Sequence, residues 1–328
     1  MRIFMIVAVS ATRHIAQAWS SRACFSHGKL GRASSISSSN SLLSTTRRYS
    51  SLISLPDALD EADTAQFIDG SWYHKGDRSG REEFEQGPRI AGSIHFDLSD
   101  MCDTESSIPS MLPSPSLLQA YLQDHHSIDT QNKHLIVYGK EGASFTPRVW
   151  FTLQRLYPRV SLMQASFEEW MAAGGPVDTE PVQVVRAADL HVSTRHGDDQ
   201  KYKDDTIDLE GMKQAVVNPD SKTLILDARG SSYAKGHMPG SIHIPYSSLA
   251  TPESSVQFRD DLSRIFREAG VDPLDHETRI TCTCGSGVSA CSLYLALKEC
   301  GRTGETVVYD GSWQEWKRYD DLQKVCPS

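Results

Sequence analysis

Three cysteines and two glycines fall within ten residues of this chain, in the stretch CTCGSGVSAC at 282–291. The run RITCTC is short, apolar and β-rich, so Cys284 is expected to end a buried strand, and a helix is expected to start near Ala290. Ligands of an open parallel sheet bind beyond the carboxyl ends of its strands. Glycines at 285 and 287 let the loop backbone approach the sulfur, and a helix N-terminus adds partial positive charge. These features favour a nucleophilic thiolate at Cys284.

The spacing around Cys284 argues against three other kinds of cysteine site. A tyrosine-phosphatase loop carries an arginine six positions after its cysteine. Here that position is Ala290, or Val288 if the count begins at Cys282. A zinc ribbon and a thioredoxin-type redox pair both need C-x-x-C, whereas this chain offers C-x-C. Cys282, two residues back on the same strand face, is interpreted as core packing, with a redox-partner role as the alternative. No metal and no cofactor is predicted.

The elements that must position Cys284 occur twice along the chain. Four pairs of similar segments recur in the same order, namely 67–72 with 224–230, 89–96 with 237–244, 134–150 with 279–295, and 166–170 with 312–316. Strands alternate with helices in each copy, and the helices expected over 254–270 and 289–301 each end at a glycine. The sequence therefore predicts an α/β fold with two homologous domains, each a parallel sheet flanked by helices on both faces.

The first 50 residues differ in composition from the rest. They hold seven of the 33 basic residues and no acidic residue, and they are rich in serine. This composition is typical of a mitochondrial transit peptide, which predicts a matrix protein; a secretory signal, from the apolar run after Arg2, and a cytoplasmic location are the alternatives. The remaining residues carry 26 basic against 42 acidic residues, a net charge of −16, which argues against direct binding of nucleic acid. No apolar run reaches the ~18–20 residues that a membrane span needs.

Four segments are expected along the chain. They are a transit peptide at 1–50, a first domain at 51–178, a polar linker at 179–205 and a second domain at 206–328. Cys24 falls in the leader. Cys102, Cys291, Cys300 and Cys326 are interpreted as buried free thiols. Gly139 stands in the first copy where Cys284 stands in the second, so only the second domain is expected to be catalytic.

The motifs around Cys284 resemble a known family. TCGSGVSAC, GVDP, LDARG, GHMPGS and YDGSW are similar to the catalytic domain of 3-mercaptopyruvate sulfurtransferases, in the two-domain rhodanese superfamily. DGSWY, REEFE, MLPS and TPRVW resemble its non-catalytic N-terminal domain, and the likeness covers nearly all of 65–320. The resemblance implies two tandem rhodanese-like domains and a sulfurtransferase of the EC 2.8.1 class. Cys284 would take sulfur from 3-mercaptopyruvate as a persulfide and pass it to a thiol, cyanide or protein. Thioredoxin or glutathione is the expected thiol acceptor, and a monomer or weak dimer is the expected state.

The resemblance also implies a set of substrate-binding residues. Thiosulfate-preferring members carry basic residues directly after the cysteine; Gly285 and Ser286 are neutral here, which favours 3-mercaptopyruvate. Ser286 is expected either to relay a proton to the leaving enolate or simply to form the turn. The loop is expected to contact the substrate through Gly285, Gly287, Val288 and Ser289.

Two arginines are implied as ligands of the substrate carboxylate. Arg229 occupies the family's position for this role, with a structural ion pair as the alternative. Arg89 stands where many members have a histidine; we expect it either to reach across the domain interface as a second ligand or to pair with Glu83 or Glu85.

Other functions are left open by one departure from the family. Members usually carry an insertion with a second arginine after the DAR segment, whereas this chain has only GSSYAK, which leaves Lys235 as a substitute. A thiosulfate:cyanide sulfurtransferase is therefore one alternative, and a non-enzymatic persulfide carrier or regulatory module, for example in tRNA thiolation, is another. A phosphatase or arsenate reductase is disfavoured by the missing arginine.

Overall fold

The computed structural model describes residues 50–74, 76–192, 204–217, 222–251, 254 and 257–326. All of them belong to one compact unit. The expected transit peptide, Cys24 and the middle of the expected linker lie outside the described residues.

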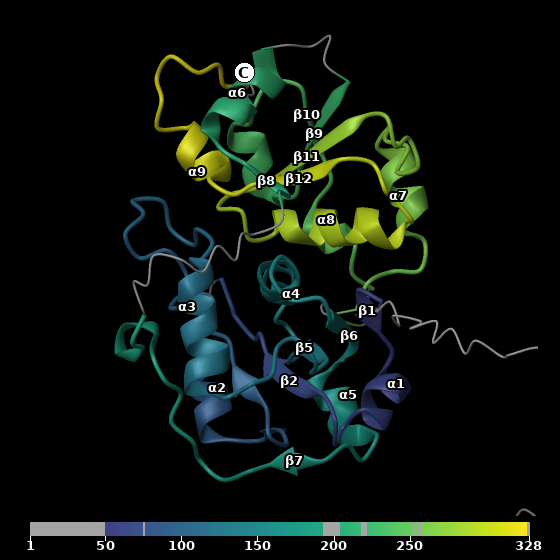
Figure 1. Cartoon of the computed structure of the whole chain (residues 1–328). Helices are drawn as coiled ribbons and strands as arrows, with labels where there is room; N and C mark the ends of the chain where they lie inside the picture. Colours follow the sequence, from purple (N-terminus) through teal and green to yellow (C-terminus); the bar gives the residue numbers. More distant parts are fainter. Residues whose placement is uncertain are drawn as a thin grey trace, which may run out of the picture. The chain divides into compact units, whose positions relative to one another are not determined.

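The first half of the described chain forms a five-stranded parallel sheet in the order β1-β6-β5-β2-β4 (Figure 1). Its strands are β1 (Leu52–Ile53), β2 (Gln66–Asp69), β4 (Ile94–His95), β5 (Leu135–Gly139) and β6 (Val160–Ser166). Its helices are α1 (Leu55–Asp60), α2 (Gly80–Gln86), α3 (Pro115–Gln119) with the π-helical turn η1 (Ala120–His125), α4 (Thr146–Gln154) and α5 (Phe167–Ala172). A separate antiparallel pair joins β3 (Arg89–Ile90) to β7 (Val177–Asp178).

The second half repeats this topology in a parallel sheet of order β10-β9-β11-β12-β8. Its strands are β8 (Thr206–Ile207), β9 (Thr223–Asp227), β10 (Ser241–His243), β11 (Arg279–Thr283) and β12 (Thr306–Tyr309). Its helices are α6 (Leu209–Val217), α7 (Leu262–Glu268), α8 (Ala290–Glu299) and α9 (Ser312–Trp316), with 3-10 turns η3 (Ser231–Lys235) and η4 (Tyr246–Ser248); a further turn, η2 (Ala187–Asp189), precedes them. Counted within each half, the strands take the same order from edge to edge. The predicted duplication is confirmed.

Both faces of each sheet are buried, because neighbouring residues of a strand point to opposite sides. In β5, Leu135 and Val137 belong to one apolar cluster, whereas Ile136 and Tyr138 belong to another. Fully burying a side chain of this size contributes about 1.5–3 kcal/mol, so continuous apolar strands stabilise such a layered fold. Helices on both faces of both sheets are therefore confirmed.

The strand register identifies the counterpart of Cys284 in the first half. Asp69 and Asp227 end the equivalent strands β2 and β9, and each pairs with a residue on the adjacent central strand. The residue that follows this partner is Gly139 in the first half and Cys284 in the second. A glycine offers no nucleophile, so the first half has the fold of the site without its sulfur.

The two halves pack together through α4 and α8, which lie between the two sheets (Figure 1). The ring of Tyr294 on α8 contacts Trp150 and Phe151 on α4, with centroid distances of 6.3 and 4.9 Å. One apolar cluster contains residues of both halves. Because α8 directly follows the Cys284 loop, the helix behind that loop rests on the first half.

The helix expected over 254–270 is shorter in the structure, where α7 begins at Leu262. Phe258 instead forms an isolated antiparallel bridge with Ala250. Asp261 takes the N-cap position, and its carboxylate accepts hydrogen bonds from Arg259 and Arg264. A contact between residues two apart cannot form on a helix surface, so the Arg259–Asp261 pair fits a turn before α7.

The expected linker begins as a packed segment. Val182 N–H donates to the Glu85 carbonyl at 2.9 Å, and Ala187 N–H donates to the Asp100 carboxylate at 2.7 Å. The chain therefore stays on the first half until at least residue 187.

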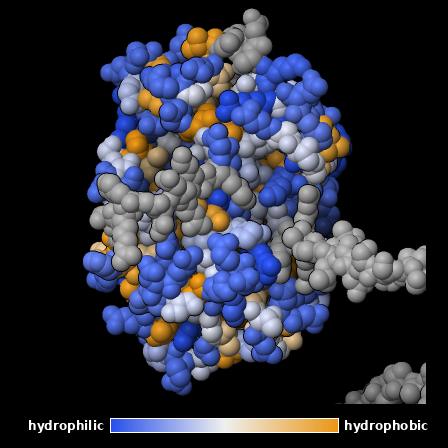
Figure 2. Space-filling view, in the orientation of Figure 1, coloured by the Kyte–Doolittle hydropathy of each residue, from blue (hydrophilic) through white to orange (hydrophobic). Residues whose placement is uncertain are grey.

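The face of the molecule in Figure 2 is mostly hydrophilic, with hydrophobic residues scattered over it. Within the described ranges, no helix is both long and apolar enough to cross a membrane.

Candidate active site

Cys284 lies directly after β11, at the carboxyl end of a central strand, as expected. Its side chain is buried, with 2% of the residue exposed. Its backbone is held by the start of α9: Cys284 N–H donates to Ser312 Oγ at 3.0 Å, and Trp313 N–H donates to the Cys284 carbonyl at 3.0 Å. The sulfur thus sits on a fixed backbone at the ligand-binding edge of the sheet.

The loop after Cys284 carries a series of unused backbone donors. Among the described residues, none accepts a hydrogen bond from the N–H groups of 285–290. Helix α8 begins at Ala290, and no side chain caps it. Unpaired N–H groups at a helix N-terminus attract a negative charge, so the loop is built to stabilise an anion near Cys284.

Only one of the two loop glycines has a left-handed backbone conformation. Gly287 has φ +78°, in the left-handed region, whereas Gly285 does not. A Cβ on Gly287 would lie 2.5 Å from the Asp310 carbonyl oxygen and 2.6 Å from Asp310 Oδ1, whereas one on Gly285 would meet nothing within 4 Å. Gly287 is therefore needed both for its conformation and for its contact with Asp310.

Ser312 was not anticipated from the sequence as a site residue. It is fully buried, and its Oγ lies 4.0 Å from Cys284 Sγ. Oγ also accepts from Thr283 Oγ1 at 3.2 Å and donates to the Tyr309 carbonyl at 2.7 Å. Its φ of +50° is rare for a residue with a Cβ and costs of order 1 kcal/mol or more. The signal was its place in YDGSW, directly beyond β12 at the same sheet edge as Cys284.

Ser312→Ala is expected to slow the reaction of the Cys284 thiol with an electrophile about tenfold, because the Cys284 N–H then loses its buried acceptor at a cost of about 1–3 kcal/mol. Ser312→Gly removes the same hydroxyl but relieves the backbone strain. Both variants should be equally slow in single-turnover assays, with the glycine variant melting at the higher temperature. Wild-type rates in the glycine variant would assign the defect to strain and not to the hydroxyl.

Arg229 lies two residues beyond β9, near the site, but its guanidinium already has a partner. Its Nη2 donates to Asp227 Oδ2 at 2.7 Å, and its Nε lies 3.0 Å from both carboxylate oxygens. Both residues are buried. The structural ion pair weighed as the alternative for Arg229 is therefore what the structure shows.

Aromatic rings surround the Arg229 guanidinium. Its Cζ lies 4.9 Å from the Trp313 ring and 5.6 Å from the Tyr233 ring. Tyr233 is in turn stacked between His237 and His243, at 4.0 and 4.2 Å. The short GSSYAK segment thus places a tyrosine beside Arg229, while Lys235 is exposed. His237 stacks on Tyr233 and Trp313 packs against Arg229, so both residues have structural roles here.

The expectation for Arg89 is wrong. Its Nη1 donates to the Glu180 carbonyl at 2.8 Å, and its Cζ lies 5.3 Å from the Phe84 ring. It belongs to β3, which pairs with β7 in the first half. Among the described residues, Arg89 contacts neither Arg229 nor the carboxylate of a glutamate on α2, because its side chain turns onto the segment after β7.

The other cysteines are less uniform than expected. All six described cysteines are free thiols, but Cys326 is exposed, and Cys102 and Cys300 are only half-buried. Cys282 is fully buried in the core, which supports a packing role, and burial raises the pKa of its thiol well above its usual value. Burial likewise raises the pKa of Cys291 to about 12, although Arg148 opposes the shift.

Of the other loop residues, Ser286 is partly exposed, whereas Val288 and Ser289 are buried. The Ser286 hydroxyl makes no hydrogen bond within the described residues, so both interpretations of this side chain stay open. Across those same residues, no group of three or more histidine, cysteine or acidic side chains could hold a metal ion.

Comparisons with known proteins agree with this arrangement. The sequence model of the rhodanese-like domain matches residues 56–173 and again 210–319. Thiosulfate sulfurtransferase from Gallus gallus is 32% identical over 264 residues, which cover 76% of this chain and 85% of that protein. The 3-mercaptopyruvate sulfurtransferase from Rattus norvegicus is 28% identical over 273 residues, covering 76% of this chain and 84% of that protein. The crystal structure of Tum1 protein from Saccharomyces cerevisiae superposes with a TM-score of 0.69, at 24% identity, over 83% of this chain and 96% of that chain.

Proposed function

Because this chain belongs to the rhodanese family of two-domain sulfurtransferases, we propose that Cys284 carries sulfur as a persulfide from a small-molecule donor to a thiol acceptor. The observation that carries the proposal is a cysteine at the sheet edge, followed by a loop whose backbone N–H groups donate to none of the described residues. Such donors stabilise a thiolate and, after transfer, a persulfide anion.

The proposed reaction has two displacement steps. The Cys284 thiolate attacks the sulfur of 3-mercaptopyruvate, an S–S bond forms, and the C–S bond breaks. The electron pair leaves as the pyruvate enolate, which takes up a proton. A thiolate such as that of thioredoxin or glutathione, or cyanide, then attacks the outer sulfur and releases the Cys284 thiolate.

The chain's own residues have distinct parts in these steps. The N–H groups of 285–290 balance the negative charge at sulfur, and Ser312 holds the Cys284 backbone. Arg229 is proposed to bind the donor carboxylate through Nη1, the guanidinium nitrogen that makes no hydrogen bond within the described residues. Ser286 is proposed to donate the proton to the enolate.

We propose 3-mercaptopyruvate as the preferred donor because Gly285 and Ser286 place no positive charge beside the sulfur. Thiosulfate is the second candidate, since the relative of this name is 32% identical. Steady-state assays with each donor and cyanide separate the two, and turnover with neither would favour a persulfide carrier without enzymatic activity.

The double variant Gly285→Arg with Ser286→Lys is expected to shift kcat/KM toward thiosulfate, by about tenfold or more, because two added cations favour a dianion. A side chain at 285 meets nothing within 4 Å, so the arginine can be accommodated. The neutral pair Gly285→Gln with Ser286→Gln is the matched control for size. Equal shifts in both variants would show that bulk, and not charge, decides the preference.

The basic, acid-free composition of residues 1–50 supports import into the mitochondrial matrix, with cleavage near Ser50. N-terminal sequencing of the protein recovered from isolated mitochondria is expected to show a start near this residue. Recovery of the uncleaved chain outside the organelle would contradict the proposal. In the mature protein, 51–178 and 206–328 are proposed as the two domains.

A further inference from the structure

An arginine of the inactive first half reaches the catalytic half. Arg148 lies on α4, within the TPRVW motif, and only 2% of it is exposed. Its Nη1 forms an ion pair with Asp310 Oδ1 at 2.7 Å. Asp310 directly follows β12, two residues before Ser312. A buried charge of the first half is therefore paired with the residue that directly follows β12 in the second half.

Arg148 makes three further contacts at this position. Nη2 donates to the Ser110 carbonyl at 2.6 Å, and Nη1 makes a long contact of 3.5 Å with the Gly287 carbonyl. Nη1 also lies 3.8 Å from Cys291 Sγ, which donates to the same Gly287 carbonyl at 3.4 Å. The carbonyl in the middle of the catalytic loop is thus contacted by two side chains, one of them from the other half.

Fixing this carbonyl also fixes an N–H group. In a planar trans peptide, the C=O of one residue and the N–H of the next point in opposite directions. With the Gly287 carbonyl turned toward Arg148, the Val288 N–H must point away from it. No described residue accepts a hydrogen bond from this N–H, so the peptide orientation decides whether it is available to an anion.

A second route leads from Arg148 through Asp310. The Asp310 carboxylate accepts from Leu112 N–H at 2.8 Å through Oδ2, while Oδ1 faces Arg148. Its carbonyl oxygen and Oδ1 occupy the space next to Gly287 that a Cβ would need. An Asp310 displaced from this position would alter both the loop and the turn that carries Ser312.

We propose that Arg148 is a positioning residue for sulfur transfer, through which the inactive half orients the catalytic loop over Cys284. The inference rests on the proposed function of Cys284. It assigns the first half a role in the reaction itself, beyond packing against α8.

Arg148 remains charged in this buried place. Burial lowers the pKa of its guanidinium, but Asp310 and Cys291 together outweigh this and hold the pKa above its usual range. Removing the charge would leave a buried carboxylate without its ion-pair partner, so lost stability alone could reduce activity. The test must therefore separate positioning from stability.

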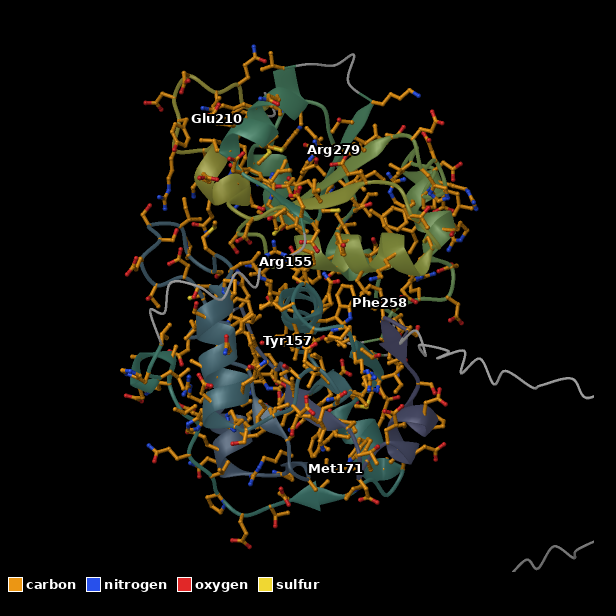
Figure 3. The ribbon with its side chains drawn as sticks, in the orientation of Figure 1. Arg155, Tyr157, Met171, Glu210, Phe258 and Arg279 are labelled. Carbon is orange, nitrogen blue, oxygen red and sulfur yellow. The ribbon has the colours of Figure 1, made fainter. Side chains whose placement is uncertain are left out.

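The chain contains a matched control for that separation. Arg155 follows α4 at its C-terminal end (Figure 3), and its Nε forms an ion pair with Asp205 Oδ1 at 2.5 Å. The side chains of Arg155 and Asp205 are 4% and 8% exposed, against 2% and 8% for Arg148 and Asp310. The two pairs thus match in burial and in joining the two halves. Arg155 contacts Asp205 through Nε and Thr206 through Nη2, and both of these partners lie at the start of β8, outside the catalytic loop.

The experiment compares Arg148→Gln, Arg148→Lys and Arg155→Gln in the full chain with two readouts. The first is the rate of iodoacetamide labelling at Cys284, followed by peptide mass spectrometry from pH 5 to 10, which needs no sulfur donor. The second is single-turnover persulfide formation with 3-mercaptopyruvate and, separately, with thiosulfate. Thermal unfolding of each variant is measured in parallel.

In Arg148→Gln, labelling of Cys284 and persulfide formation are each expected to be about tenfold slower than in wild type. Arg148→Lys should lie between wild type and Arg148→Gln, because lysine keeps the positive charge but lacks the planar guanidinium with its several N–H donors. Arg155→Gln should match wild type in both readouts at a similar loss of melting temperature. Equal labelling profiles in Arg148→Gln and Arg155→Gln would overturn the inference. If Arg148→Gln does not fold, equal profiles in wild type and Arg148→Lys would overturn it. Wild type that labels normally but forms no persulfide would instead refute the proposed function.

Discussion

Cys284→Ser is expected to abolish sulfur transfer, lowering the rate by at least about three orders of magnitude. A serine hydroxyl is almost un-ionised at neutral pH and is a far weaker nucleophile than a thiolate. The fold should persist, because serine is close in size to cysteine and the Cys284 backbone is held by Ser312 and Trp313. The loss would therefore lie in chemistry and not in stability.

Intact-mass spectrometry after donor treatment provides the measurement. Wild type should gain the mass of one sulfur atom, and Cys284→Ser should gain none. Cys300→Ser is the matched control, since Cys300 is a free, half-buried thiol at the end of α8, and it should behave like wild type. An adduct that persists in Cys284→Ser and maps to Cys282 would contradict the assignment. Burial and the raised pKa of Cys282 both argue against that result.

The position of Cys284 could be predicted because every determinant is local. An apolar run, a glycine-containing turn and a helical stretch follow one another within 279–299, and each has a backbone preference of its own. The duplication was detectable for the same reason, since its matched segments recur in order. Local patterns of this kind fix the strand, the loop and the sheet edge together.

Contacts between segments far apart in the sequence could not be predicted in this way. Arg148 and Asp310 meet only because α4 and α8 pack between the sheets, and no spacing rule joins them. The Arg89 prediction failed for the same reason: its outcome depends on how β3 meets β7. A repeat shows which elements are equivalent, but it does not show which of their side chains cross between halves.

The Arg229 ion pair could have been predicted from the sequence, although the family resemblance favoured a role in substrate binding. Asp227 and Arg229 are two residues apart at a strand end, where alternating side chains share a face. A carboxylate beside a guanidinium on one face of a buried strand end is expected to pair with it, since an unpaired buried charge is costly. The pair lowers the net charge that Arg229 can offer to a donor carboxylate. This is a physical reason for the donor preference to depend strongly on the loop at 285–286.

The two loop glycines provide the second large expected effect, because their environments differ although they are two residues apart. Gly287→Ala must place a Cβ 2.5 Å from the Asp310 carbonyl oxygen while keeping φ near +78°. Backbone atoms cannot yield as a flexible side chain does, so we expect the free energy of unfolding to fall by about 2–4 kcal/mol. If the loop relaxes instead, its N–H groups shift away from Cys284 and persulfide formation slows about ten- to a hundredfold.

Gly285→Ala is the matched control. Its Cβ meets nothing within 4 Å, and its φ lies outside the left-handed region, so stability should be unchanged or higher by about 0.4–1 kcal/mol through the lower entropy of the unfolded chain. Chemical denaturation and single-turnover persulfide formation, measured on both variants, test the pair. Equal effects at 285 and 287 would mean that the loop is not seated on Asp310. The contact between Gly287 and Asp310 would then not be what fixes the backbone N–H groups of the loop.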